Sequence, residues 1–250
     1  MKTGKIPENV LKRAVLRQIG IRNGINGSGA GIGNDCAIFP FSGTDWEQAG
    51  MSPAEAGVPA LCTQEAVLAW KEAPGIGDAF MTMAELIQKC ANNLAAGGAC
   101  PAAVMIALFV PESAEEADVR VWMAEAAQKC TELSIKIIGG QTRTVSAAIC
   151  PMAVVTGYGI ASAGHCVIGR AESGQDVVVS KWIGLQGTAV LVRRHKERLL
   201  QRYPAYLVKE AEGFGRYLSV LPEAEIALQH GVRAMHDASE GGIFGALWEL

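Results

Sequence analysis

The chain has 250 residues, of which 50% are hydrophobic and 19% are charged, with a formal net charge of -3 and a mean hydropathy of +0.20. This composition supplies enough apolar surface for a substantial core and excludes a disordered chain. The slight acidity gives no electrostatic basis for binding nucleic acid or an anionic membrane. A phosphate-bearing ligand would therefore need local devices such as glycine-rich loops, a metal ion or single basic residues.

The seven cysteines occur singly, mostly among apolar neighbours, and no C-x-x-C pair indicates a zinc site or a redox dithiol. They are typical of buried thiols in a reducing cytosol, so we expect a cytoplasmic protein. Residues 1–22 alternate basic and apolar residues, unlike a signal peptide. No uninterrupted apolar stretch approaches the length of a membrane span.

The first 160 residues alternate between helical and strand patterns. In chain order, the patterns predict an amphipathic helix over 7–19, a glycine-rich loop over 23–33, strands over 36–39 and 60–63, a helix over 78–96, a strand over 103–110, a helix from a capping box at Ser113 and Glu116 to residue 133, and strands over 135–138 and 153–160. Strands interleaved with helices predict an α/β (α+β) fold in which helices cover a sheet. We assign residues 1–160 to a first domain.

A polar, glycine-bearing linker over 161–174 separates this unit from a second one over 175–250. The second unit is predicted to contain strands over 176–180 and 232–235 and helices over 187–202, 203–218 and 223–229. Nothing after Trp248 resembles a helix stop, and two strands cannot form a sheet covered on both faces. We therefore expect an incomplete second α/β domain that continues beyond Leu250.

The last stretch, residues 236–250, reads as a polar turn that delivers the start of an apolar helix. The first N–H groups of a helix have no internal partner, so its N-terminus suits an anion, and Gly241 and Gly242 would let a phosphate approach the main chain. The simpler interpretation is that Asp237 or Ser239 is an N-cap and the glycines relieve packing.

Four further places bring polar groups to the ends of predicted strands or helices beside small residues, which is where α/β sheets bind ligands. They are residues 31–35 with Gly31, Gly33 and Asp35, residues 63–65 with Glu65, residues 91–94 with Asn93, and residues 139–142 with Gly139, Gly140, Gln141 and Thr142. Each acid or amide has a simpler interpretation as an ordinary turn or surface residue.

Taken in order with residues 183–189 and the motif His-Asp-Ala-Ser-Glu-Gly-Gly at 236–242, these places resemble the signatures of the AIR synthase (PurM)-related superfamily. The start of the chain, Met-Lys-Thr-Gly-Lys-Ile-Pro, and residues 235–242 are most similar to its HypE-like branch, the hydrogenase maturation factors. The resemblance covers nearly the whole chain and implies a PurM-like two-domain architecture.

The resemblance also implies ATP and Mg²⁺ as cofactors, phosphorylation of a carbonyl-type oxygen on a small-molecule or protein-borne acceptor, and a homodimer formed through the first-domain sheet. In a true HypE the reaction is dehydration of a carbamoyl group, with hydrogenase maturation proteins as partners. The implied nucleotide-binding residues are Gly31, Gly33, Asp35, Asn93, Gly139, Gly140, Gln141, Thr142, Asp237, Gly241 and Gly242, and the implied metal ligands are Asp35, Glu65 and Asp237.

The chain departs from the family pattern by replacing acids with amides, since Asn93 and Gln141 stand where the family has aspartate. Each replacement removes a negative charge and leaves a neutral carbonyl oxygen for Mg²⁺, which should weaken the affinity for metal–ATP. Two hypotheses follow. The chain is either an ATP-dependent enzyme of this type or a catalytically degenerate relative that binds nucleotide or a partner without turnover.

Overall fold

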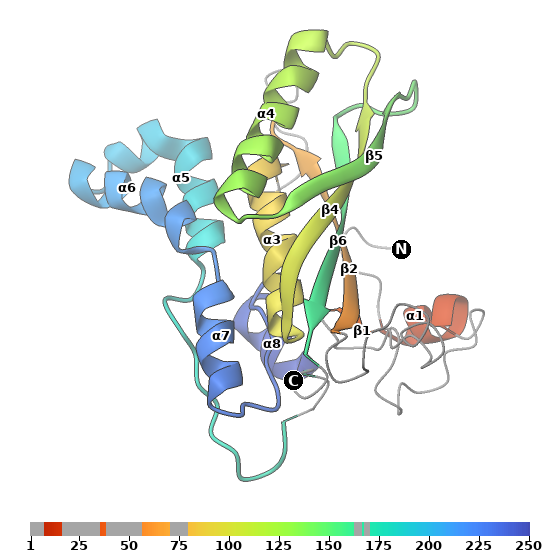
Figure 1. Ribbon diagram of the computed structural model, residues 1–250. Coiled ribbons are helices and arrows are strands. Elements are labelled where there is room, and N and C mark those ends of the chain that lie inside the picture. Colours follow the sequence, from red (N-terminus) through yellow and green to blue (C-terminus); the bar gives the residue numbers. More distant parts are fainter. Residues whose placement is uncertain (1–7, 17–35, 39–56, 71–79, 163–166, 168–170) are drawn as a thin grey trace, which may run out of the picture.

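The computed structural model describes residues 8–16, 36–38, 57–70, 80–162, 167 and 171–250. One sheet and the two helices that cover it form its body, and a second set of helices follows (Figure 1). The short α1 (Glu8–Leu11) and the π-helix η1 (Lys12–Leu16) occupy part of the range predicted as the opening helix. The predicted glycine-rich loop over 23–33 lies outside the described residues.

Within the described residues the sheet has six strands, in the order β1-β2-β6-β4-β5, with β3 paired to β2. The strands are β1 (Ala37–Ile38), β2 (Val58–Leu68), β3 (Phe80–Met81), β4 (Ala99–Val110), β5 (Lys136–Thr144) and β6 (Met152–Ala161). Strand β6 is antiparallel to both β2 and β4, whereas β4 and β5 are parallel. The strand predictions for the first half are confirmed, although β2 and β5 extend well beyond the predicted ranges. Strand β3 was not predicted, and its residues lie at the start of the range predicted as the helix over 78–96.

Two helices cover one face of this sheet, α3 (Met83–Ala96) and α4 (Glu116–Glu132) (Figure 1). Helix α3 begins at a capping box in which Thr82 accepts from the Glu85 amide at 3.1 Å and Glu85 accepts from the Thr82 amide at 3.0 Å. The predicted capping box of α4 at Ser113 is wrong. A turn from Pro111 to Ala114 precedes the helix, so the box forms two residues later, between Glu115 and Asp118.

Alternation along the strands separates a helix-facing side from an open side of the sheet. On β2, Cys62 and Leu68 are buried, and the Cys62 and Cys90 Sγ atoms are 3.4 Å apart. The open side presents large apolar side chains that are 40% to 49% exposed: Leu61, Met105, Met152 and Ile160.

The hydrogen bond to Cys90 and burial both raise the pKa of the Cys62 thiol. Cys100 is exposed, so the prediction of buried cysteines holds for five of the six described.

The second region, residues 172–250, is helical where it is regular: α5 (Leu185–Leu200), α6 (Ala205–Glu212), the 3-10 helix η2 (Gly213–Tyr217), α7 (Leu221–Gln229) and α8 (Gly242–Glu249). The helix predictions are confirmed. The predicted strands over 176–180 and 232–235 are wrong, because neither segment pairs with another strand in the described part of the chain. A strand pattern forms a strand only where a neighbour completes its ladder.

The second region lies beside α3, with α5 and α6 projecting away from the sheet (Figure 1). None of the helices that the structure describes is long and apolar enough to cross a membrane.

Candidate functional site

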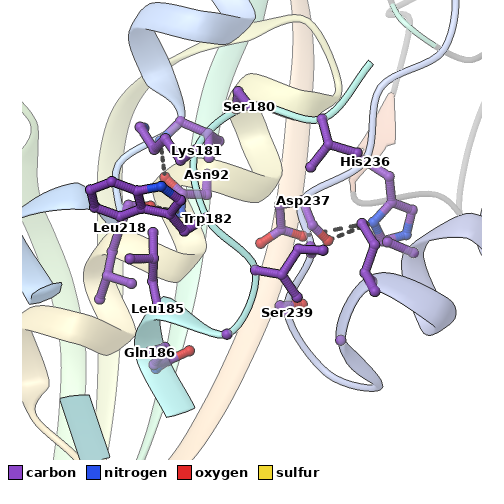
Figure 2. Close-up of a pocket in the computed structure, with 18 of the residues that line it drawn as sticks. Asn92, Ser180, Lys181, Trp182, Leu185, Gln186, Leu218, His236, Asp237 and Ser239 are labelled. Atoms are coloured by element: carbon purple, nitrogen blue, oxygen red, sulfur yellow. Dashed lines mark hydrogen bonds and ion pairs between the residues drawn. The ribbon is translucent and has the colours of Figure 1, made fainter. Parts of the chain in front are cut away.

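A cavity of about 420 Å³ lies between α3 and the second region. One wall is the polar face of α3, with Glu85, Gln88, Lys89 and Asn92. The opposite walls are residues 177–187, Tyr217, Leu218, Val220, residues 236–239 and the inner side of α8. Figure 2 shows Asn92, Lys181 and Trp182 on one side of this space and His236 and Asp237 on the other. The cavity is therefore built where the two regions meet.

The polar side chains of α3 hold the second region through three separate contacts. Arg193 of α5 donates to both carboxylate oxygens of Glu85, at 2.7 and 3.1 Å. Lys89 Nζ lies 3.1 Å from Glu240, in the loop before α8. These side chains recur at helical spacing on one face, so a single stripe on α3 contacts several elements at once.

Asn92 makes the third contact, at the start of α7. Its Nδ2 donates to the Leu218 carbonyl at 2.7 Å, and its Oδ1 accepts from the Val220 amide at 3.1 Å and from Gln88 at 2.9 Å. The side chain is 7% exposed overall. A buried amide with both ends engaged fixes the position of the chain that enters α7.

The loop from His236 to Ser239 carries the most buried acid of the cavity wall. Asp237 is 6% exposed, and burial raises the pKa of its carboxyl above the ordinary value, while His236 and Lys89 act in the opposite direction. His236 Nδ1 lies 3.9 Å from the Asp237 carboxylate, and its Nε2 lies 2.9 Å from Glu249 on α8. A carboxylate, an imidazole and a second carboxylate thus follow one another at this end of the cavity.

The start of α8 explains the glycine pair of the motif. Gly241 is the N-cap residue with φ of 83°, and Gly242, the first residue of the helix, has φ of 61°. Only glycine adopts this left-handed backbone at little cost. The predicted helix start is confirmed, and Gly242 lines the cavity.

The other sequence-predicted site residues lie elsewhere. Gly31, Gly33 and Asp35 lie outside the described residues. Glu65 is exposed. Side chains alternate along β2, and Cys62 and Leu68 face the helices, so Glu65 faces the open side of the sheet. Asn93 is buried in α3 but does not line the cavity. The sheet and α3 separate Glu65 from Asp237, so the role of each as a metal ligand stays a separate prediction.

Residues 139–142 lie on β5, at the edge of the sheet, with Gly139, Gly140, Gln141 and Thr142 all exposed. A Cβ on Gly140 would come within 1.9 Å of the Ile106 carbonyl oxygen, which explains the glycine by its close approach to β4. Gln141 lies on this edge strand and pairs in register with Ala107 of β4, the next strand of the sheet.

Within the described residues, no group of three or more His, Cys, Asp or Glu side chains could hold a metal ion. A magnesium ion bound together with a nucleotide usually takes only one or two carboxylates from the protein, with phosphate oxygens and waters as its other ligands, so Glu65 and Asp237 stay predictions. Asp35, the third predicted ligand, lies outside the described residues.

Sequence reasoning placed residues 91–94 of α3 at the site through Asn93 but missed the rest of the polar face of this helix. Glu85, Lys89 and Asn92 form a polar stripe at helical spacing that is typical of a solvated face, yet each is at most 9% exposed. Lys181 is paired with Glu223 at 2.6 Å, and His236 lies 2.9 Å from Glu249. His195 is exposed on α5.

Comparison with known proteins now identifies the relatives. The family described as AIR synthase related protein matches with its N-terminal domain over residues 76–161 and with its C-terminal domain over residues 172–250. The chain belongs to the AIR synthase related family. A curated relative, the carbamoyl dehydratase HypE of Rhodobacter capsulatus, is 29% identical over 162 residues, which are 64% of this chain and 45% of that protein. The match thus spans less than half of that relative.

Solved structures show the same fold at low identity. The crystal structure of a HypE–HypF complex matches with a TM-score of 0.63 at 19% identity and covers 94% of this chain and 69% of that one. The protein tt0281 from Thermus thermophilus matches with a TM-score of 0.59 at 21% identity, covering 88% of this chain and 65% of that one. The structure of AaThiL complexed with AMPPCP and TMP matches with a TM-score of 0.57 at 16% identity, and it covers 92% of this chain and 65% of that one. The PurM-like, HypE-like prediction is confirmed at the level of family and fold.

Proposed function

We propose that this chain is an ATP-dependent, HypE-like protein that transfers the γ-phosphoryl group of ATP to a carbonyl-type oxygen of an acceptor. The observation that carries the proposal is the alignment of 162 residues with a carbamoyl dehydratase HypE. The fold shared with a ThiL complexed with AMPPCP and TMP also supports a nucleotide ligand. For an acceptor that carries a carbamoyl group, phosphorylation of its oxygen would prepare the dehydration used in hydrogenase maturation.

The residues proposed to bind the nucleotide are those predicted from the sequence. Gly31 and Gly33 would cradle the phosphates, and the Asp35 carboxylate would hold Mg²⁺. Asn93, residues 139–142, Asp237, Gly241 and Gly242 remain candidates for the surrounding contacts. When bound, the metal would supply positive charge against the phosphate oxygens.

Isothermal titration with a non-hydrolysable ATP analogue, with and without Mg²⁺, tests this proposal on the 250-residue chain. We expect metal-dependent binding that Asp35→Asn weakens at least about tenfold, because the substitution removes the charge but keeps the shape. Asp176→Asn, the same change at an exposed position outside the cavity, is the matched control. Absence of any binding would contradict the proposal.

A second function, nucleotide or partner binding without turnover, is favoured by a specific observation. The family's acidic positions carry Asn93 and Gln141, and no metal-ligand group forms among the described residues. The double variant Asn93→Asp with Gln141→Asp separates the two functions in a phosphate-release assay. A rise in metal-dependent turnover, with unchanged circular dichroism, would indicate that the amides suppress catalysis, whereas turnover by the unaltered chain would rule out the degenerate function.

We also propose a homodimer formed through the open side of the sheet. Leu61, Met105, Met152 and Ile160 place 40% to 49% exposed apolar side chains there, around the polar Thr63 and Glu65, and interfaces combine such apolar side chains with polar ones. Sedimentation velocity should show a dimer that Met105→Glu converts to a monomer. Val121→Glu, a similar change on the exposed side of α4, should leave the dimer intact.

A further inference from the structure

Four cysteines lie buried in the core that the sheet forms with its two helices. They are Cys36, Cys62, Cys90 and Cys130, each at most 7% exposed. Within this cluster, the Sγ atoms of Cys62 on β2 and Cys90 on α3 are 3.4 Å apart. The two residues are 28 positions apart in the sequence, far from any C-x-x-C spacing, so the packing of α3 on the sheet creates this pair of thiols.

A glycine on the neighbouring strand permits this close approach. Gly157 of β6 pairs in register with Cys62. A Cβ atom at Gly157 would lie 2.5 Å from the Cys90 Sγ atom and 3.4 Å from the Cys62 Sγ atom. The first distance is too short for a real contact, so any side chain at this position would displace the Cys90 thiol. Its absence leaves the two sulfur atoms in direct contact.

The contact is close to the geometry of a disulfide. The S–S bond of a disulfide is about 2.0 Å long, so the two Sγ atoms would have to approach by about 1.4 Å. Both side chains already point toward each other, and the Cys62 thiol also donates to the Cys90 carbonyl at 3.3 Å. The remaining distance is of the order that rotation of two side chains and a small shift of α3 supply.

Oxidation of this pair requires a local opening of the core. The thiolate is the form that reacts with oxidants, and the hydrogen bond to Cys90 and burial raise the pKa of the Cys62 thiol, so its thiolate is scarce in the folded chain. Cys90 is fully buried. The pair should therefore react slowly and only with an oxidant small enough to enter during such openings.

We propose that Cys62 and Cys90 form a modification site, at which a hydroperoxide oxidises the two thiols to a disulfide that joins α3 to β2. One thiolate attacks H₂O₂ and its O–O bond breaks, which leaves a sulfenic acid and a hydroxide that takes up the released thiol proton. The second thiol then attacks the oxidised sulfur, the S–S bond forms, and a second water leaves. The two cysteines lose two electrons, and the peroxide is reduced to two water molecules.

The disulfide would act on the helix that positions the second region. Helix α3 presents Cys90 to the sheet, while Glu85, Lys89 and Asn92 of the same helix contact the second region. A covalent link to β2 would restrict the movement of α3 and of this polar face. The inference goes beyond the proposed function, because it involves neither the nucleotide nor the acceptor.

Peptide mapping of the unaltered 250-residue chain tests the proposal. The folded chain is treated with H₂O₂ at neutral pH, its free thiols are blocked with iodoacetamide, and it is digested without reductant. We expect mass spectrometry to find the peptides of Cys62 and Cys90 joined, at about 2 Da below their summed reduced mass, and to lose this species after reduction. Oxidation confined to the exposed Cys100, or a link formed equally well by the chain in urea, would overturn the proposal.

Two variants measure the effect of the link on α3. Cys62→Ser removes one partner, and Cys130→Ser is the matched control, since it removes a buried thiol of the same cluster and keeps the pair. After H₂O₂ treatment, hydrogen exchange in α3 should slow at least about threefold in the unaltered chain and in Cys130→Ser, but not in Cys62→Ser. Equal exchange in all three treated chains would overturn the proposal. Because the peptide map uses the unaltered chain, it decides the question even where a variant does not fold.

Discussion

The sheet with α3 and α4 and the helical second region are stabilised in different ways. Every member of the main buried core cluster lies between residues 36 and 161, including Leu86, Ile87 and Leu108 at 0% exposure. The described residues of the second region contribute none of its members. Their own buried apolar residues are few, and they contact α3 largely through Arg193, Glu240, Leu218 and Val220.

The difference indicates that hydrophobic burial stabilises the first region, while directed polar contacts position the second. Apolar burial is non-directional and scales with area, whereas a buried hydrogen bond or ion pair fixes one geometry. A ligand cavity that forms at the junction is therefore sensitive to single polar substitutions that would barely change the core. The predictions below test this contrast.

The largest effect is expected in the core of the first region. Leu86→Ala removes a side chain that is fully buried between α3 and the sheet, and it should lower the free energy of unfolding by about 2–5 kcal/mol. Leu191→Ala on α5, where leucine is 57% exposed, should change it by about 0.5 kcal/mol or less. Urea unfolding measures both, and equal losses would remove the proposed contrast.

The next effect is expected at Asn92. Asn92→Ala leaves the Leu218 carbonyl and the Val220 amide without this partner, at a cost of about 1–3 kcal/mol. Hydrogen exchange should accelerate in α7 more than in β4 or β6, because the loss detaches the second region and leaves the core intact. Gln128→Ala, which removes a hydrogen bond on the exposed side of α4, is the control. Uniform acceleration would mean that the two regions unfold together.

Asp237 should make stability depend on pH in a defined direction. Its folded-state pKa lies above 3.8 because of burial, so the folded chain binds the proton more tightly than the unfolded chain. The resulting stabilisation is complete below that unfolded value and is lost as the pH rises through the folded-state pKa. The Asp237→Asn variant has no such titration, so its free energy of unfolding minus that of the unaltered chain should rise between pH 3.5 and pH 7. Urea unfolding at about constant salt measures this difference. A difference that falls with rising pH would contradict the prediction.

The smallest effect is expected for an exposed ion pair within the second region. Lys196 lies 2.8 Å from Glu212, with side chains 49% and 40% exposed. Lys196→Ala should change the free energy of unfolding by about 0.5 kcal/mol or less, because solvent screens such pairs. Raising the salt concentration should reduce the difference further. A loss comparable to that of Asn92→Ala would show that exposed polar contacts also position this region.

The sequence by itself determined the periodic elements of the first region and the helices of the second. Apolar spacing along 83–96 and the alternation along β6 require no distant partner to be recognised, because each pattern follows from the geometry of its own element. The ordered motifs also predicted the family, since six matches in sequence order are far more specific than any one of them. The helix start at Gly241 and Gly242 belongs to the same class of local signal.

Only the tertiary structure decided which residues share a site. The valine-rich segment 176–180 has a strand pattern but no strand partner in the described chain, and a ladder depends on a neighbour that local sequence does not specify. Glu85, Lys89 and Asn92 look like a solvated face until residues from 193 to 240 cover them. The same packing separates Asp237 from Glu65 and places it opposite Trp182, because contacts between residues far apart in sequence arise only when the two regions meet.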